Sequence, residues 1–431
     1  MAGRARGRRA QEQRPGRGKF TGGCGVTDGL GLFDNSRSQD RHDDEYDYDD
    51  EPRKPRGKKR RSPTFWVVAV VVVAIIAGGA WYGVTQVLGI GGFDDYTGAG
   101  ETDVVVEVKA GQGTADIGAA LKAKDVVASS RAFTSAGEDQ PKVKAVQPGF
   151  YLMKTKMSGK AAADRIVSKD ARVGNLQIRA GTQLDDIKLP GDKTTPGVFT
   201  LIANAGRVTM NGKETGPTVE ELRKVAETVD LKDLGAPAWA VPFASQVEPK
   251  RRLEGLITPG VYDVEPGVSA QELLTKVVKD SATTLDGWGM PKLAEKTGYT
   301  PYQVLVMGSL IEREGIAKDF DKISRVIYRR LADNIRLGFD STINYVLDRP
   351  TITTDSSARE SQNPYNTYKN FGLTPTPIAA TSKAALQAAA KPADGPWVYF
   401  VKCEKDGTSC FAETQGQHDQ NVRDARARDV Y

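Results

Sequence analysis

The chain has 431 residues, of which 39% are hydrophobic and 27% are charged, a balance typical of globular proteins. This length allows two or three domains. The net charge of +5 lies entirely within residues 1–63, which hold 16 Lys/Arg and 11 Asp/Glu. Because the remainder is charge-balanced, the composition argues against nucleic acid as a partner of the larger, C-terminal part.

The N-terminal 90 residues predict a tail and a membrane anchor. Residues 1–61 are Arg/Gly-rich, then acidic, then basic, and so few apolar residues predict a disordered tail. From Phe65 to Leu88 there are 24 residues without a charge, which is long enough for a transmembrane helix at 65–88. Seven Lys/Arg directly before this stretch predict a cytoplasmic N-terminus. An uncleaved single-pass anchor in the cell membrane fits better than a signal peptide, because the stretch is too long.

The three cysteines fit this topology. Cys24 lies in the cytoplasmic tail, where a reduced thiol is expected. Cys403 and Cys410 flank Asp406-Gly407, a pair typical of hairpin turns. Facing each other across a hairpin outside the membrane, these two cysteines are either a disulfide or two free thiols, and the disulfide is the favoured interpretation.

Apolar patterning divides the outer part of the chain into three regions. Residues 100–190 read as strand-then-helix units, with strands at 104–108, 149–153 and 176–178, and this pattern predicts a small LysM-like glycan-binding subdomain. Residues 191–252 form a less patterned connection. Residues 253–425 predict an α+β catalytic domain, with strands at 397–401 and 410–414. The helices expected from 191 onward are 218–229, 269–278, 291–296, 301–315, 319–331 and 380–390.

The residue types present exclude several kinds of active site. His42 and His418 are the chain's two histidines, so a histidine-rich zinc site is not available. No Gly-x-Ser-x-Gly motif and no phosphate-binding loop occur. We therefore expect no metal and no cofactor, and acid–base chemistry by carboxylates remains.

One carboxylate lies within an apolar helical stripe. At about 100° per residue, Val304, Met307, Leu310 and Ile311 share one side of the predicted helix. Glu314 falls on the same side, whereas Glu312 points away. A carboxyl held against apolar neighbours is expected to have a raised pKa, which suits a general acid acting on a sugar–oxygen bond.

Polar and aromatic residues follow this helix in the sequence. Asp340 comes after a predicted helix, and the segment Asn363-Pro-Tyr-Asn-Thr-Tyr368 follows it. Tyr365, Asn366 and Tyr368 suit a saccharide, through ring stacking and hydrogen bonds to hydroxyl and acetamido groups. Segments of this kind are also common as plain turns, so both interpretations stay open at this point.

The order of these pieces resembles the endolytic murein transglycosylases, the MltG or YceG-like family, of the actinobacterial type. The resemblance covers roughly residues 100–425. It rests on Gly308-Ser-Leu-Ile-Glu-Arg-Glu-Gly315, Arg325-Val-Ile-Tyr-Arg-Arg-Leu331, Leu337, Asp340-Ser-Thr342, Tyr345, Asn363-Pro-Tyr-Asn-Thr-Tyr368, Gly372-Leu373, Pro375, Pro377-Ile378, Trp397-Val-Tyr-Phe-Val401, Phe411, His418 and Asn421. The family's Glu-Gly-aromatic-aromatic-Pro segment corresponds to Glu254-Gly-Leu-Ile-Thr-Pro259, without the aromatics.

The resemblance implies Glu314 as the catalytic residue, with substrate contacts from Glu312, Asp340, Tyr365, Asn366, Tyr368 and Glu254. The implied reaction cleaves the β-1,4 bond between N-acetylmuramic acid and N-acetylglucosamine and leaves a 1,6-anhydro end. The implied partners are peptidoglycan glycan strands, penicillin-binding protein synthases, and divisome or elongation proteins.

Two other interpretations remain. A lysozyme-like hydrolase would cut the same bond with water and leave a reducing end. A non-enzymatic peptidoglycan-binding or divisome scaffold would use Glu314 as a buried structural acid, paired with Arg330.

Overall fold

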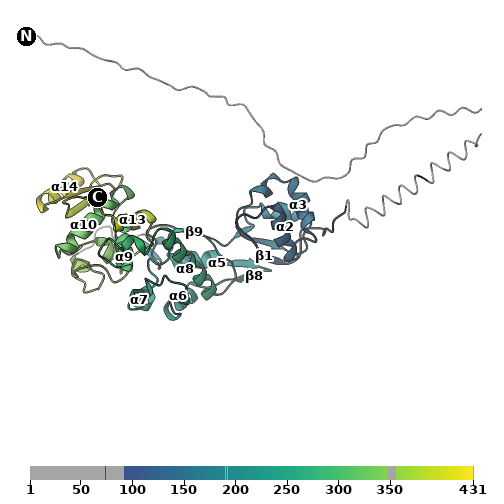
Figure 1. The fold of residues 1–431 in the computed structure, drawn as a ribbon, viewed down its shortest axis with the longest axis horizontal. Helices are drawn as coiled ribbons and strands as arrows, with labels where there is room; N and C mark the ends of the chain where they lie inside the picture. Colours follow the sequence, from purple (N-terminus) through teal and green to yellow (C-terminus); the bar gives the residue numbers. More distant parts are fainter. Residues whose placement is uncertain (1–72, 74–91, 190, 192, 348–355, 431) are drawn as a thin grey trace, which may run out of the picture. The chain divides into compact units, whose positions relative to one another are not determined.

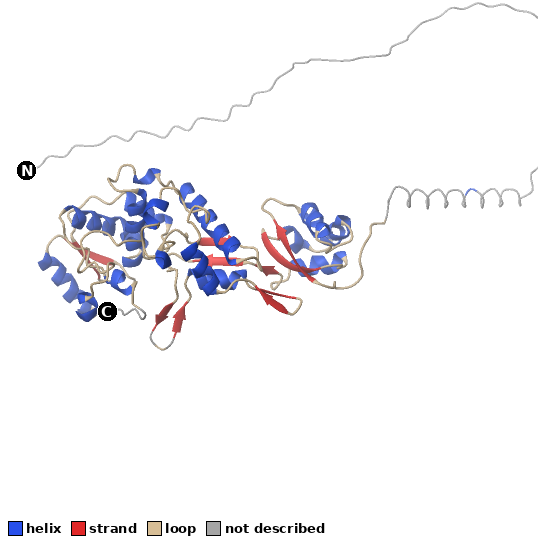
Figure 2. Cartoon of the chain, turned by 90° about the horizontal axis from the view of Figure 1, so that it is seen from below, coloured by secondary structure: helices blue, strands red, loops and turns tan. Residues whose placement is uncertain are grey.

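The computed structural model describes Val73 and residues 92–189, 191, 193–347 and 356–430. Apart from Val73, these residues belong to one compact unit, Ala77–Tyr431. The predicted tail, and all of the predicted membrane span except Val73, lie outside the described residues. Within those residues, no helix combines the length and apolar character needed to cross a bilayer. The described fold is α+β, with short antiparallel sheets among many helices (Figures 1 and 2).

The first part of the fold has its own hydrophobic core. Its antiparallel sheet has the order β1-β2-β3, and Val106, Phe133 and Met153 lie at its centre. Its elements are β1 (Asp103–Val108), α2 (Thr114–Ala123), α3 (Ser130–Glu138), the 3₁₀ turn Pro141–Ala145, β2 (Gly149–Lys154), α4 (Gly159–Ile166) and β3 (Arg172–Val173). The first two predicted strand–helix units are therefore confirmed.

The third expected strand–helix unit does not form, so that prediction is wrong. β4 (Asn175–Ile178) pairs with β9 (Gly260–Asp263), far along the chain. After β4 the backbone bonds to a distant segment instead of coiling: the N–H of Gly181 donates to the carbonyl of Ala380, and the N–H of Ala380 donates to the carbonyl of Thr182, each at 2.8 Å. Gly181 also has a φ of +80°, which a helix does not allow. Tertiary pairing thus overrides the local pattern.

The second core is larger and extends from Leu176 to Ala389. It includes buried residues of the region 191–252, so that stretch is part of a packed unit. The remaining elements are β5 (Ile187–Leu189), β6 (Lys193–Thr195), α5 (Val198–Gly206), β7 (Val208–Met210), β8 (Lys213–Thr215), α6 (Val219–Thr228), α7 (Val241–Ala244), α8 (Ala270–Gly287), α9 (Pro301–Glu314), α10 (Phe320–Ala332), α11 (Asp340–Asn344), α12 (Ser356–Glu360), α13 (Lys383–Ala390), β10 (Tyr399–Lys402), β11 (Ser409–Ala412) and α14 (Gln415–Ala427).

Most predicted helices of this part are confirmed, with two differences. The helix predicted at 269–278 continues to Gly287 as α8. Val277, Ser281 and Leu285 are buried at a spacing of four residues, so its buried face extends beyond residue 278. The segment 291–296 forms only a 3₁₀ turn, Lys292–Ala294. α13 and α10 both pack against α9 (Figure 1), so α9 lies at the centre of this part.

The last hairpin is closed by a disulfide. β10 and β11 are antiparallel, and Gly407 at the turn has a φ of +88°, as the Asp406-Gly407 pair predicts. Cys403 and Cys410 form a disulfide with a Cα–Cα distance of 5.6 Å, so the favoured interpretation is confirmed. The hairpin also contacts the segment after α9, since the N–H of Ser409 donates to Asp319 Oδ2 at 2.8 Å.

Candidate active site

The helix that carries Glu314 has strong sequence signals at its start. Thr300 is the N-cap residue, Pro301 is the first helical residue, and the side chains of Thr300 and Gln303 form a capping box, all of which favour helix initiation. The predicted stripe is confirmed, because Val304, Met307, Leu310 and Ile311 are fully buried. Burial is wider than predicted: every residue from Tyr302 to Ile311 except Gln303 is buried.

The helix ends where the core ends. Glu312, Arg313 and Glu314 are half-buried. Gly315 follows in an extended conformation, and a Cβ there would lie 2.2 Å from Cδ1 of Ile323 on α10. Glycine at this position leaves room for the Ile323 side chain, so the chain passes close to α10 as it leaves α9. The carboxyl of Glu314 is thereby held at the end of a rigid, buried helix.

The environment of Glu314 favours its protonated form. Burial raises the pKa of the Glu314 carboxyl, and the nearby charge of Asp340 raises it further. Hydrogen bonding from Ser341 and the charge of Lys402 lower this pKa in part. The Ser341 hydroxyl is buried and has no other hydrogen-bond partner among the described residues. It is thus available to donate to the Glu314 carboxylate once the proton has left.

Asp340 anchors a polar cluster next to Glu314. The hydroxyl of Tyr368 donates to Asp340 Oδ1 at 2.8 Å, and Arg359 forms an ion pair with Asp340 at 3.2 Å. The Arg359 guanidinium also lies over the Tyr368 ring, 4.8 Å from its centroid. All three side chains are partly exposed, so they form a half-open polar surface suited to a sugar.

The two glutamates of the Glu-x-Glu motif have different surroundings. Glu312 accepts a hydrogen bond from the N–H of Ser382, the N-cap residue of α13, at 3.1 Å. Among the described residues, Glu314 has no ion pair with Arg330. Arg330 donates instead to the carbonyls of Val398 and Leu337. The ion pair with Arg330, which the scaffold interpretation offered as one partner for Glu314, is therefore absent from the described part of the chain.

Tyr365 and Asn366 lie beneath the polar surface. Tyr365 is 6% exposed and its hydroxyl lies 2.9 Å from Oγ1 of Thr376. Asn366 is 1% exposed and its amide donates to the carbonyls of Arg359 and Ser361. The Asn366 Oδ1 accepts from the N–H of Tyr368. In this structure both residues hold the segment that presents Arg359 and Tyr368.

Glu254 is buried in a separate network. It accepts hydrogen bonds from the N–H of Leu184 at 3.2 Å and the hydroxyl of Tyr345 at 3.0 Å. Burial raises the pKa of Glu254 to about 7. Tyr345 packs against Tyr365 with ring centroids 5.0 Å apart, and Arg251 lies over both rings. Glu254 thus links the backbone at Leu184 to Tyr345, which in turn packs against Tyr365.

Three residues of the site were missed by sequence reasoning: Ser341 and Lys402, which influence the Glu314 carboxyl, and Arg359, which pairs with Asp340. Ser341 directly follows Asp340, so the resemblance pointed to its position without giving it a role. Arg359 and Lys402 lie on α12 and β10, far from Glu314 in the sequence. No local sequence pattern places Arg359 or Lys402 at the site, and the tertiary fold brings them there.

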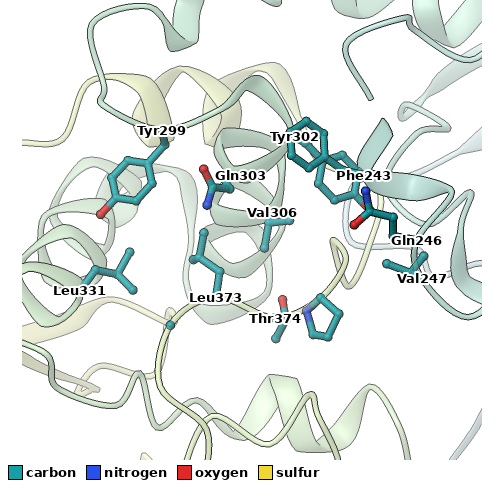
Figure 3. A pocket seen from close by; sticks show the side chains of 12 residues that line it. Phe243, Gln246, Val247, Tyr299, Tyr302, Gln303, Val306, Leu331, Leu373 and Thr374 are labelled. Carbon is teal, nitrogen blue, oxygen red and sulfur yellow. The ribbon is translucent and has the colours of Figure 1, made fainter. Parts of the chain in front are cut away.

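A cavity of about 500 Å³ borders the first half of α9 (Figure 3). Phe243, Tyr299, Tyr302 and Leu373 line it, and the rings of Phe243 and Tyr302 are stacked with centroids 5.5 Å apart. Tyr302 lies 12 residues before Glu314 on the helix, so about 18 Å separates the two along the axis. Glu314 is not among the lining residues, and the cavity is distinct from the polar surface around it.

Comparison with known proteins identifies the family of this chain. The sequence profile of the YceG-like family matches residues 106–424. The chain belongs to the YceG-like family. This membership confirms the resemblance stated from the motifs, and it covers both hydrophobic cores of the structure.

Curated relatives of this YceG-like chain have been named for their activity. This chain is 26% identical over 324 residues to the endolytic murein transglycosylase of Bacillus subtilis (strain 168). The match covers 74% of this chain and 84% of that protein. It is 23% identical over 377 residues to the endolytic murein transglycosylase of Streptococcus pneumoniae serotype 2, covering 83% of this chain but only 64% of that protein. A crystal structure of a yceG-like protein from Listeria monocytogenes has 24% identity and a TM-score of 0.49, over 74% of this chain and 98% of that chain.

Within the part of this YceG-like chain that the structure describes, no group of three His, Cys, Asp or Glu side chains has the arrangement of a metal site. His418 stacks on Tyr399 with ring centroids 5.4 Å apart, and burial lowers its pKa.

Proposed function

We propose that the protein is a membrane-anchored endolytic lytic transglycosylase that cuts nascent peptidoglycan strands. The substrate bond is the β-1,4 link between N-acetylmuramic acid and N-acetylglucosamine, and the product carries a 1,6-anhydro end. The observation that carries the proposal is the raised pKa of Glu314, at the end of a buried helix and beside a half-open polar surface. Family membership supports the substrate class.

The reaction needs one acid–base group. Glu314 donates its proton to the glycosidic oxygen, which leaves as the 4-hydroxyl of N-acetylglucosamine as the bond from that oxygen to C1 breaks. The C6 hydroxyl oxygen of the muramic sugar attacks C1 and closes the anhydro ring. The proton of that hydroxyl passes to the Glu314 carboxylate, which restores the acid. The nucleophile belongs to the substrate, so no second catalytic carboxylate is required, in contrast to most glycoside hydrolases.

The neighbouring groups suit both halves of this cycle. Burial and Asp340 keep the resting carboxyl protonated, while Ser341 and Lys402 stabilise the carboxylate that forms after proton transfer. Asp340 is held by Tyr368 and Arg359, and we assign this trio to binding sugar hydroxyl and amide groups. We assign a supporting role to four other residues, whose contacts hold the segments around that trio: Glu312, Tyr365, Asn366 and Glu254.

Location and glycan capture complete the proposal. The predicted span at 65–88, with its basic flank, would hold the catalytic part outside the membrane and close to newly made strands. The sheet and helices of residues 103–173 form a small separate core, to which we assign LysM-like glycan binding. Cutting near the membrane would terminate strand elongation, next to penicillin-binding protein synthases and the division or elongation proteins.

The experiment that tests this function is an analysis of product ends. The purified chain is incubated with peptidoglycan, and the released fragments are separated and weighed by mass spectrometry. The proposal predicts 1,6-anhydro-muramic ends. Muramic reducing ends would show a lysozyme-like hydrolase. Retention of glycan without any cleavage would support the scaffold interpretation.

A further inference from the structure

One strand of the second core is hydrogen-bonded on one side only. β4 and β9 form a two-stranded sheet, in which the carbonyl of Gly174 accepts from the N–H of Val264 at 2.9 Å. Given the register, Leu176 and Ile178 also exchange hydrogen bonds with β9. The N–H and C=O groups of Asn175 and Gln177 therefore point to the free edge. In the described part of the chain, no further bond engages them.

This free edge borders a cavity of about 540 Å³, a size typical of small-ligand sites. Leu201 and Ala205 of α5 contribute an apolar wall, and the side chains of Asn175 and Gln177 add exposed amides. Of the described residues that line the cavity, Arg179 alone carries a charge. Arg179 is exposed and has no ion pair with another described residue.

A hydrogen bond links the segment that lines the cavity to the end of α9 that carries the proposed catalytic acid. Thr182 lines the cavity, and its neighbour Gly181 accepts a hydrogen bond from Nη1 of Arg313 at 3.2 Å. Arg313 immediately precedes Glu314. The short segment after β4 therefore contacts the last turn of α9 through this hydrogen bond.

We propose that this cavity binds an extended, carboxylate-bearing peptide attached to the glycan that Glu314 cuts, namely the stem peptide of the muramic sugar. The inference rests on the proposed function. An extended peptide adds to an open strand edge through main-chain hydrogen bonds, which Asn175 and Gln177 offer. Arg179, at the end of this edge, pairs with a peptide carboxylate. The site would make the protein selective for glycan that still carries its peptides.

The test compares two substrates with the full chain. One is glycan strands with intact stem peptides, and the other is the same strands after an amidase has removed the peptides. The wild-type protein is expected to cleave the peptide-bearing strands with a kcat/KM about tenfold higher, the ratio that one charge-assisted contact supplies. Free peptides released by the amidase are expected to inhibit cleavage of the intact strands competitively.

Two variants locate the effect. Gln177→Pro removes one N–H from the free edge without removing a bond to β9, and Arg179→Gln removes the cation. Each is expected to lower kcat/KM about tenfold for intact strands and to leave the bare strands unaffected. The matched controls are Val261→Pro, whose N–H points to the opposite edge of the same sheet, and Arg426→Gln on exposed α14. Circular dichroism and thermal unfolding check that every variant is folded.

The outcomes separate this inference from the proposed function. Equal cleavage of both substrates by the wild type, unchanged by the two variants, would overturn the peptide site and leave the transglycosylase proposal standing. A change of oligomeric state in Gln177→Pro would also overturn it, since the edge would then belong to an interface between copies. Cleavage of neither substrate by the wild type would contradict the proposed function itself.

Discussion

The N–H of Ser382 donates a hydrogen bond to Oε2 of Glu312 at 3.1 Å, so this carboxylate is occupied in holding the start of α13. Ser382 is the N-cap residue, and its own side chain accepts from the N–H of Ala385. A negative charge at this end of a helix is stabilising. The neighbouring acid Glu314 is surrounded differently, by buried groups and by Ser341 and Asp340 at the start of α11, which separates the roles of two residues only two positions apart.

Glu312→Ala is expected to destabilise the protein by about 1 kcal/mol, the typical cost of a lost capping interaction. Glu312→Gln keeps an acceptor oxygen and is expected to cost less. Thermal unfolding measures both variants. A stability loss in Glu312→Ala no larger than that of an exposed control, Glu413→Ala, would show that the contact with α13 contributes little.

Lys402→Gln is expected to shift the pH dependence of cleavage. Because the charge of Lys402 lowers the pKa of Glu314, its removal raises that pKa. The general acid then stays protonated to higher pH, and the alkaline limb of kcat/KM against pH moves upward. Lys405→Gln, a few residues away at the exposed tip of the hairpin, is the control. A downward shift, or an equal shift in both variants, would contradict the assignment of Glu314 as the acid.

Glu254 is expected to make stability depend on pH between about 4.5 and 7. Its pKa is raised from 4.5 to about 7 in the folded chain, so the folded state holds the proton over a range in which the unfolded state has lost it. The free energy of unfolding therefore falls as pH rises through this window, by about 3 kcal/mol in total. Glu254→Gln keeps an acceptor for Tyr345 and removes the titration.

Thermal unfolding at pH 5 and pH 8 checks this prediction. The wild type should lose more stability between the two values than Glu254→Gln does, and Glu220→Gln, on the exposed face of α6, should behave like the wild type. Identical pH slopes in all three proteins would show that Glu254 does not titrate in this range.

Removing the Cys403–Cys410 disulfide is expected to loosen the hairpin that packs on the segment after Glu314. The bridge closes a short loop, for which about 2 kcal/mol of stability is typical. The double variant Cys403→Ser/Cys410→Ser should unfold at a lower temperature and cleave glycan more slowly, because Asp319 and Ser409 connect the hairpin to the chain after α9. Cys24→Ser is the control, and reductant should reproduce the effect in the wild type and in this control but not in the double variant. Equal activity and unfolding temperature in the double variant would contradict the role given to this bridge.

Local patterns predicted the helix of the site well. The stripe from Val304 to Ile311 and the predicted helix at 301–315 agree with the structure, since both follow from patterns that act over a few turns. The disulfide was predictable for the same reason: Asp406-Gly407 sets a tight hairpin between its two cysteines.

Long-range pairing was not predictable from local patterns. Leu176–Ile178 looked like the start of a third strand–helix unit, yet β4 pairs with residues 260–263. Lys402 and Arg359 reach the site from distant elements through tertiary packing. The aromatic and amide residues of 363–368 were expected to contact sugar, but periodicity cannot distinguish the half-buried Tyr368 from the buried Tyr365.

The most direct test of the central claim compares Glu314→Gln with Glu312→Gln in one assay. Both purified variants are first shown to unfold cooperatively, and the anhydro-muropeptides that each releases from peptidoglycan are then quantified by mass spectrometry. We predict that Glu314→Gln releases none above background, while Glu312→Gln retains most of the wild-type rate. Undiminished release by a folded Glu314→Gln protein would contradict the assignment of this carboxyl as the acid that cleaves the glycan.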